Sequence, residues 1–189
     1  MLWLQGEVPE DSRVTGVEWT RGAEVMRIRF VFRALSLLAM VLAPCLAAGQ
    51  SPGPDELPLN SQLARTAWQA LDGGDFERAI ALTDSCIAEF GGQAEVEQGR
   101  LDSLGVSEPP EGGVSDATKV EIFSHGILND VGTCHFIRAT AFEKSGRNED
   151  ACEAYRAAAR FHHARCWDPK GWFWSPAKAA VGKLRSLGC

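Results

Sequence analysis

The chain has 189 residues, with 25 acidic and 19 basic side chains and a formal net charge of −6. Its lysines and arginines form no cluster, which argues against a nucleic acid as the binding partner. The roughly 140 residues that follow position 49 are enough for one domain with a modest hydrophobic core.

Residues 26–49 have the pattern of a secretory signal peptide. A basic start is followed by an uncharged apolar run over 34–41 and by small residues that fit a cleavage site after Gly49. The apolar run is too short to span a bilayer, so we expect no stable membrane insertion after cleavage. The sequence therefore predicts an exported protein, periplasmic or secreted. Residues 1–25 are expected to be a mis-assigned start or an unstructured extension.

A helical domain is expected over 59–189, after a proline-rich stretch at 50–58 that predicts a disordered tether. The domain begins with two predicted helices on either side of a Gly-Gly-Asp turn at 73–75. Apolar and small residues recur at three- and four-residue steps, namely Leu63, Ala67, Ala70 and Leu71 on the first helix, and Phe76, Ala79, Ile80, Thr83, Cys86, Ile87 and Phe90 on the second.

A second helical pair is predicted between Asn129 and Pro169, where the proline ends the pair. Its small residues repeat the spacing of the first pair: Ala139, Phe142, Gly146 and Ala151 align with Ala67, Ala70, Gly74 and Ala79. This pattern resembles the tetratricopeptide repeat (TPR), a helix–turn–helix unit of about 34 residues. The resemblance covers residues 60–90 and 130–169. It implies an all-α fold of two TPR-like α-α hairpins.

Residues 91–129 separate the two pairs and predict an irregular insert. We expect a short helix over 93–104 and a loop over 105–116, where prolines and glycines gather. The run VEIF at 120–123 fits either a strand or a helix.

A capping helix is predicted at the C-terminus. Ser175 supplies its N-cap, and Pro176 suits its first turn. The helix has an apolar face and would cover the last exposed surface of a repeat array. That face consists of Ala177, Ala180, Val181, Leu184 and Leu187.

The run WDPKGWFW at 167–174 is unusually rich in aromatic residues. It is similar to the ending of small exported TPR-like proteins, and this similarity also implies an exported helical protein. Trp167, Trp172 and Trp174 could form a platform that binds carbohydrate or cell wall. We favour a plug that closes the core, because exposed aromatic patches are uncommon.

Five cysteines remain after the predicted cleavage site, and an exported domain meets an oxidising compartment. In an antiparallel helix pair the start of one helix lies beside the end of its partner. This geometry predicts the disulfides Cys134–Cys166 and Cys152–Cys189. Cys86 lies among small core residues and is expected to remain a buried thiol.

No metal, cofactor or catalytic residue is assigned. His162, His163 and Cys166, with His135, have a spacing that could hold a metal ion, but adjacent histidines on a helix point in different directions. Two acids near the aromatic end have simpler roles, Asp130 as a helix cap and Asp168 as a turn former. A hydrolase is therefore the least favoured interpretation.

The sequence favours a non-catalytic scaffold that binds another protein, and self-association is also possible. TPR-like units bind ligands on the surface of their first helices. On that surface the candidate partner-binding residues are Trp68, Phe136, Thr140 and Lys144.

Overall fold

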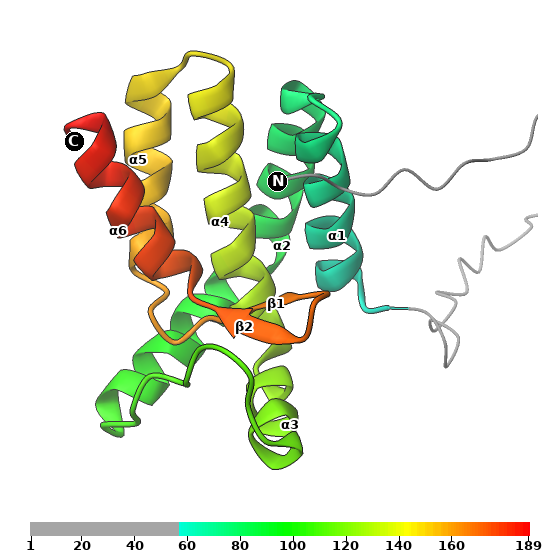
Figure 1. Cartoon of the computed structure of the whole chain (residues 1–189), viewed down its shortest axis with the longest axis vertical. Coiled ribbons are helices and arrows are strands. Elements are labelled where there is room, and N and C mark those ends of the chain that lie inside the picture. Colours follow the sequence, from blue (N-terminus) through cyan, green and yellow to red (C-terminus); the bar gives the residue numbers. More distant parts are fainter. Residues whose placement is uncertain (1–56) are drawn as a thin grey trace, which may run out of the picture. The chain divides into compact units, whose positions relative to one another are not determined.

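The computed structural model describes residues 57–189 (Figure 1), where six helices and one two-stranded sheet are found. Helices hold 71% of these residues, which confirms the all-α class. None of these helices has both the length and the apolar character that a bilayer span requires. The expected extension, signal peptide and most of the tether lie outside the described residues. The elements are α1 (Leu59–Asp72), α2 (Phe76–Ser103), α3 (Asp116–Ser124), α4 (Gly126–Lys144), α5 (Asn148–Ala159), β1 (Cys166–Asp168), β2 (Trp172–Trp174) and α6 (Pro176–Leu187).

Two helical hairpins, α1–α2 and α4–α5, have matching turns (Figure 1). Gly74 and Gly146 both have a φ of 79°, a conformation that glycine adopts without steric strain. In each turn the next residue closes the helix end with a backbone hydrogen bond. Its N–H donates to the carbonyl five residues back, from Asp75 to Ala70 and from Arg147 to Phe142, both at 2.9 Å.

The helices stack so that each packs mainly against its neighbours. α4 packs against both helices of the first hairpin, and α6 packs against α5 and α4 (Figure 1). Small side chains let the helices approach closely, because the core between them is rich in alanine. The fully buried alanines of this core are Ala67, Ala79, Ala139, Ala141, Ala151, Ala158 and Ala180.

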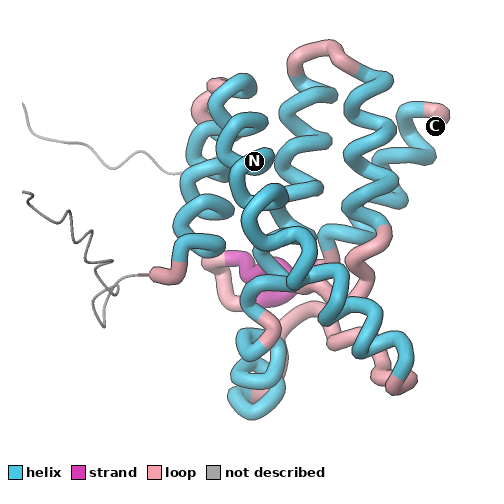
Figure 2. The backbone as a smooth tube through the Cα atoms, turned by 180° about the vertical axis from the view of Figure 1, so that it is seen from behind, coloured by secondary structure: helices cyan, strands magenta, loops and turns pink. Residues whose placement is uncertain are grey.

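The helix α2 is longer than predicted. It continues through Gly91 and Gly92 to Ser103, and its second half extends beyond α1, its partner in the first hairpin (Figure 2). Ala94, Gln98 and Leu101 are buried on this half, and their packing outweighs the roughly 1 kcal/mol that each glycine costs in a helix.

The helix expected over 93–104 is present, but it continues α2 instead of forming a separate short helix. The loop that follows ends at Ser115, whose Oγ accepts a hydrogen bond from the N–H of Thr118 and caps α3. The VEIF run, left open between strand and helix, is helical and lies in α3.

The helix α5 ends at Ala159, well before Pro169, where the sequence predicted its end. Phe161 and Ala164 instead turn back onto α4 at Gly132, where an added Cβ would lie 2.6 Å from the Cβ of Ala164. Both residues are buried in this contact, which a continuing helix could not make. The chain then forms the β1–β2 hairpin before α6 begins.

A buried arginine joins this turn to the loop that follows α2. The guanidinium of Arg165 has no solvent-exposed surface. Its Nε donates to the carbonyl of Pro109 at 2.8 Å, and Nη2 donates to the same oxygen. Its Nη1 donates to the carbonyls of His162 and Ala164, both at 2.8 Å. Burial lowers the pKa of this guanidinium, and the hydrogen bonds satisfy its donors.

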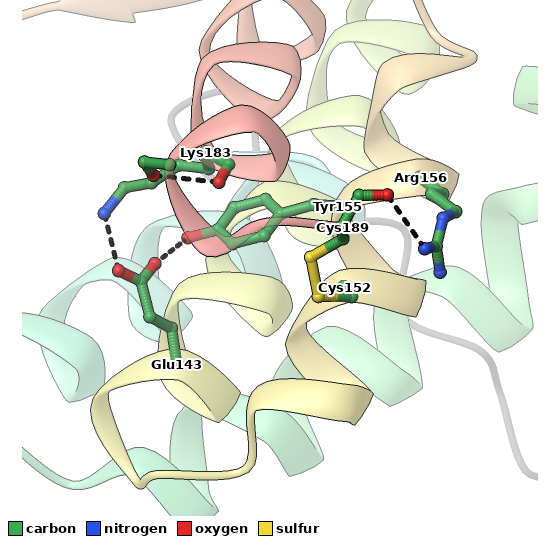
Figure 3. Close-up of a disulfide and its surroundings, with 7 residues drawn as sticks. Glu143, Cys152, Tyr155, Arg156, Lys183 and Cys189 are labelled. Atoms are coloured by element: carbon green, nitrogen blue, oxygen red, sulfur yellow. Dashed lines mark hydrogen bonds and ion pairs between the residues drawn. A yellow bond between two sulfur atoms is a disulfide. The ribbon is translucent and has the colours of Figure 1, made fainter.

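The expected disulfide between Cys152 and Cys189 is present (Figure 3). It joins Cys152, near the start of α5, to Cys189, the second residue after α6, with a Cα–Cα distance of 6.0 Å. Gly188 ends α6 in the left-handed conformation and directs the chain toward this bond.

The predicted disulfide between Cys134 and Cys166 is wrong, because both residues are free thiols. The prediction assumed that Cys166 ends a helix, whereas it lies on β1. Cys134 faces Cys86 of α2 in the core, and Cys86 is the buried thiol that was expected.

Loss of the disulfide should lower the stability of the domain. The bond closes a loop with a sequence separation of 37 residues, for which a contribution of roughly 2 to 4 kcal/mol is expected. A reductant should therefore lower the urea midpoint of the wild type and leave that of the Cys152→Ser/Cys189→Ser variant unchanged. A reductant effect of equal size in the double variant would mean that another pair of cysteines is bonded.

A buried histidine in α4 makes the fold sensitive to acid. His135 is 8% exposed and stacks on Phe161, with ring centroids 5.2 Å apart. Its Nδ1 has no hydrogen-bond partner among the described residues. Burial, followed by the charges of Arg138 and Arg160, lowers the pKa of His135 to about 4.

Because this pKa lies below its ordinary value, the stability that the neutral ring contributes is present above pH 6.5 and is lost as the pH falls toward 4. Between pH 7.5 and 4.5 this one group should remove about 2 kcal/mol from the free energy of unfolding. Urea unfolding at both pH values should show a smaller loss for His135→Gln than for the wild type. The half-buried His125→Gln is the matched control, and equal losses in the wild type and His135→Gln would contradict the assignment.

Candidate functional site

The β1–β2 hairpin presents its side chains on two opposite faces. Residues that pair directly across an antiparallel sheet point to the same side. The pairs are Cys166 with Trp174, Trp167 with Phe173, and Asp168 with Trp172. Trp167 and Phe173 therefore occupy one face, and the other two pairs occupy the opposite face.

On the second of these faces, Trp174 packs against side chains of α1 and α4. The centroid of its ring lies 6.3 Å from that of Trp68 on α1 and 5.2 Å from that of Phe136 on α4. Phe136 in turn lies 5.7 Å from the ring of Tyr155 on α5. We call Trp68, Phe136, Tyr155 and Trp174 the aromatic cluster. Two predicted partner-binding residues and one residue of the predicted aromatic platform thus meet at one place.

The other face of the hairpin packs against α3. Phe173 is fully buried, and Phe123 of α3 lies against it with ring centroids 5.3 Å apart. Trp167 contacts both of these rings, at 4.8 Å from Phe173 and 5.9 Å from Phe123. The ammonium of Lys119 lies 4.0 Å from the centroid of Trp167, a cation–π contact.

The three tryptophans of the predicted platform therefore do not share one surface. Trp167 lies on the opposite face from Trp172 and Trp174, and both Trp167 and Trp174 are half-buried. Trp172 is 40% exposed. The contacts of Phe173 and Trp174 are those of a plug between α3 and the two hairpins.

The remaining predicted partner-binding residues lie further along α4. Thr140 donates its hydroxyl to the carbonyl of Phe136 at 2.9 Å, and its Oγ1 lies 3.1 Å from the hydroxyl oxygen of Tyr155. Lys144 is exposed in the last turn of α4. All four candidate residues thus lie on α1 and α4, with Trp68 and Phe136 half-buried.

A charged network fixes this end of α4 to the neighbouring helices (Figure 3). Glu143 accepts hydrogen bonds from the hydroxyl of Tyr155 at 2.5 Å and from the ammonium of Lys183 at 2.8 Å. Burial raises the pKa of Glu143, but these hydrogen bonds outweigh it and hold the pKa below its ordinary value. Burial and the Glu143 carboxylate both raise the pKa of Tyr155. The phenol therefore stays protonated and keeps donating to Glu143.

The two acids weighed for catalysis have separate structural partners. The sequence predicted Asp130 to be a helix cap, but it lies inside α4, whose N-cap is His125. Its carboxylate accepts from Asn60 Nδ2 at 2.6 Å and Ser61 Oγ at 2.7 Å in α1, and burial raises its pKa. Asp168 is the expected turn former, since its Oδ1 accepts from the N–H of Lys170 at 2.8 Å.

The four residues considered as metal ligands from the sequence do not lie together in the structure. His135 stacks on Phe161 in the core, and the pKa of the Cys166 thiol is raised to about 11 by burial. Among residues 57–189, neither joins His162 and His163 in a group with metal-binding geometry.

No protein-family model, curated protein or solved structure matches this chain. The functional proposal below is therefore supported by the helix packing and the side-chain contacts of the described residues.

The plug predicts different roles for two tryptophans of the same hairpin. Trp174→Ala removes a half-buried ring from the aromatic cluster and should lower the free energy of unfolding by roughly 2 to 4 kcal/mol. Trp172→Ala, the matched control on the same strand, should change it by less than about 1 kcal/mol. Urea unfolding measures both, and similar losses for the two variants would mean that Trp174 is not a packing residue.

Proposed function

We propose that this chain is an exported, non-catalytic scaffold of the TPR type that binds another protein. The helix packing supports this proposal. The turns of the two hairpins match at Gly74 and Gly146, and α6 packs on the second hairpin much as α4 packs on the first. Hairpins that contact mainly their neighbours are the arrangement of helical repeat proteins, in which a terminal helix covers the last apolar face.

The proposed partner surface follows α1 and α4, the first helices of the two hairpins. It offers the half-buried rings of Trp68 and Phe136 at one end and the exposed ammonium of Lys144 at the other, with Thr140 between. Partly buried aromatic rings beside polar groups are frequent anchors in protein interfaces. A second copy of this chain could occupy the same surface, so self-association is one form that the interaction can take.

The disulfide supports export. Stable disulfides belong to oxidising compartments such as the periplasm or the extracellular space. Cys152 and Cys189 join elements that are already packed together, α5 and the end of α6, which is the arrangement of a structural bond. Together with the signal-peptide pattern of residues 26–49, this favours a protein that works outside the cytoplasm.

Carbohydrate binding is a second candidate, and the exposed ring of Trp172 is the observation that favours it. A single exposed ring offers one stacking surface, whereas the proposed platform required three. Glycan-array binding that Trp172→Ala abolishes would support this second candidate over the scaffold.

A photo-crosslinking residue should locate the partner surface. Placed at Lys144, it should form a specific adduct with a protein from the native exported fraction, or with a second copy of the chain. Placed at Glu89, an exposed position on α2, it should form none. Lys144→Glu should weaken the interaction by roughly fivefold if an acidic group faces this lysine, because reversing a surface charge changes binding by about 1 kcal/mol.

Adducts are identified by mass spectrometry, and sedimentation of the purified chain separates self-association from binding of another protein. Equal adduct yields from positions 144 and 89, or none from position 144, would contradict the proposed surface.

A further inference from the structure

Three side chains from distant parts of the sequence converge beside the buried Arg165. Asp102 lies in the last turn of α2, whereas His162 and His163 lie in the turn after α5. The Nε2 atoms of both histidines face the same carboxylate oxygen, Asp102 Oδ1, at 3.1 Å from His162 and 3.2 Å from His163. One donor atom from each residue lies within 4.8 Å of the other two.

His162 and His163 do not lie on a helix, although the sequence predicted that they would. Because α5 ends at Ala159, His162 and His163 lie in a turn that brings their rings together, with centroids 4.6 Å apart. The rule that neighbouring side chains on a helix diverge does not apply to a turn.

The geometry points to a binding site for a divalent transition-metal ion, with Zn²⁺ as the best fit, formed by Asp102, His162 and His163. Zn²⁺ binds imidazole nitrogens and carboxylate oxygens at about 2.0 to 2.2 Å in a tetrahedral arrangement, which places neighbouring donor atoms roughly 3.4 Å apart. The two nitrogen-to-oxygen distances observed here need to lengthen by only a few tenths of an ångström to admit the ion. Two imidazoles and one carboxylate are a donor set that suits zinc better than magnesium or calcium.

The surroundings of the two histidines supply further polar partners. His163 is 2% exposed, so its ring lies largely out of water. Glu108 Oε1 lies 3.5 Å from His162 Nδ1, an atom without a hydrogen-bond partner among the described residues, and a small shift would let it accept this N–H when His162 binds metal through Nε2. Arg165 and Lys178 lie 3.7 and 3.8 Å from the other oxygen of Glu108 and balance its charge.

The side-chain amide of Gln98 lies among the three proposed ligands. Gln98 Nε2 lies 3.0 Å from His162 Nε2 and 3.1 Å from Asp102 Oδ1, and it donates to the carboxylate. Gln98 Oε1 accepts from the backbone N–H of His163 at 3.2 Å, which holds the histidine turn against α2. Binding of the ion requires the amide nitrogen of Gln98 to move aside while these ligands stay.

The site has room for further donors. Three protein ligands leave one tetrahedral position for water or another ligand. His162 lines a surface hollow of about 370 Å³, His163 lines a second of about 190 Å³, and Glu108 borders both. The ion would join the end of α2 to the turn after α5, a role that goes beyond the proposed protein-binding surface on α1 and α4.

Zinc titration of the full chain tests this inference. After removal of metal with a chelator, binding is measured by competition with a chromophoric zinc indicator. The wild type should bind one Zn²⁺ per chain in the micromolar range or tighter, and Asp102→Asn and His162→Gln should each weaken binding by at least about tenfold. Both replaced side chains are partly exposed, so these variants should fold. Circular dichroism in chelator checks this.

A matched control and a spectroscopic readout separate this site from others. His125→Gln removes a half-buried histidine that pairs with Glu97 at 2.9 Å, outside the three-residue group, and should bind zinc as the wild type does. Cobalt substitution should give an imidazole–carboxylate spectrum without a thiolate charge-transfer band. The inference is overturned if the wild type fails to bind zinc in the micromolar range. It is also overturned if Asp102→Asn and His162→Gln bind as the wild type does, or if cobalt reports thiolate ligands.

Discussion

Four hydrogen bonds from the buried guanidinium of Arg165 reach three backbone carbonyls and hold together two segments far apart in the sequence. Pro109 belongs to the loop after α2, whereas His162 and Ala164 belong to the turn after α5. A buried charge with unsatisfied donors costs several kcal/mol, so these bonds favour the observed arrangement of the loop and the turn. That arrangement places the end of α2 beside the two histidines and starts β1 at the next residue.

The hairpin that follows is stabilised by side chains more than by its backbone. Strands of three residues offer few hydrogen bonds, and an isolated two-stranded hairpin is marginal in water. Here each face is covered, one by Phe123 of α3 and the other by Trp68 and Phe136. Gly112 forms an isolated antiparallel bridge on the other edge of β2, since it exchanges hydrogen bonds of 2.7 and 2.9 Å with Phe173. The run is rich in aromatic residues because the hairpin packs against helices on both of its faces.

The parts of the fold that local chemistry determines could be predicted from the sequence. Gly74 and Gly146 mark turns that need a positive φ, and Ser175 caps α6 with a hydrogen bond from the N–H of Lys178. The alanine periodicity located the helix contacts. The Cys152–Cys189 disulfide could also be predicted, because the start of one helix lies beside the end of its antiparallel partner.

The errors come from tertiary contacts that no local pattern records. Packing of Ala94 and Leu101 carries α2 through two glycines, and the close approach of Ala164 to Gly132 is incompatible with a longer α5. Asp102 was not a candidate residue, because it lies beside His162 and His163 only when α2 is longer and α5 is shorter than the sequence predicted. The error in where α5 ends thus explains two wrong predictions, the disulfide of Cys166 and the rejection of a metal site at His162 and His163.

Trp174 would limit how a partner uses the surface proposed on α1 and α4. A tryptophan that buries about half of its roughly 200 Å² gains on the order of 2 to 3 kcal/mol from its contacts with Trp68 and Phe136. A partner that displaced the ring would lose that energy, roughly a hundredfold in affinity. The favourable mode therefore leaves Trp174 in place and uses the exposed edges of the aromatic cluster together with Lys144. In that mode the hairpin would belong to the proposed binding surface, and its position, set by Arg165 and α3, would contribute to specificity.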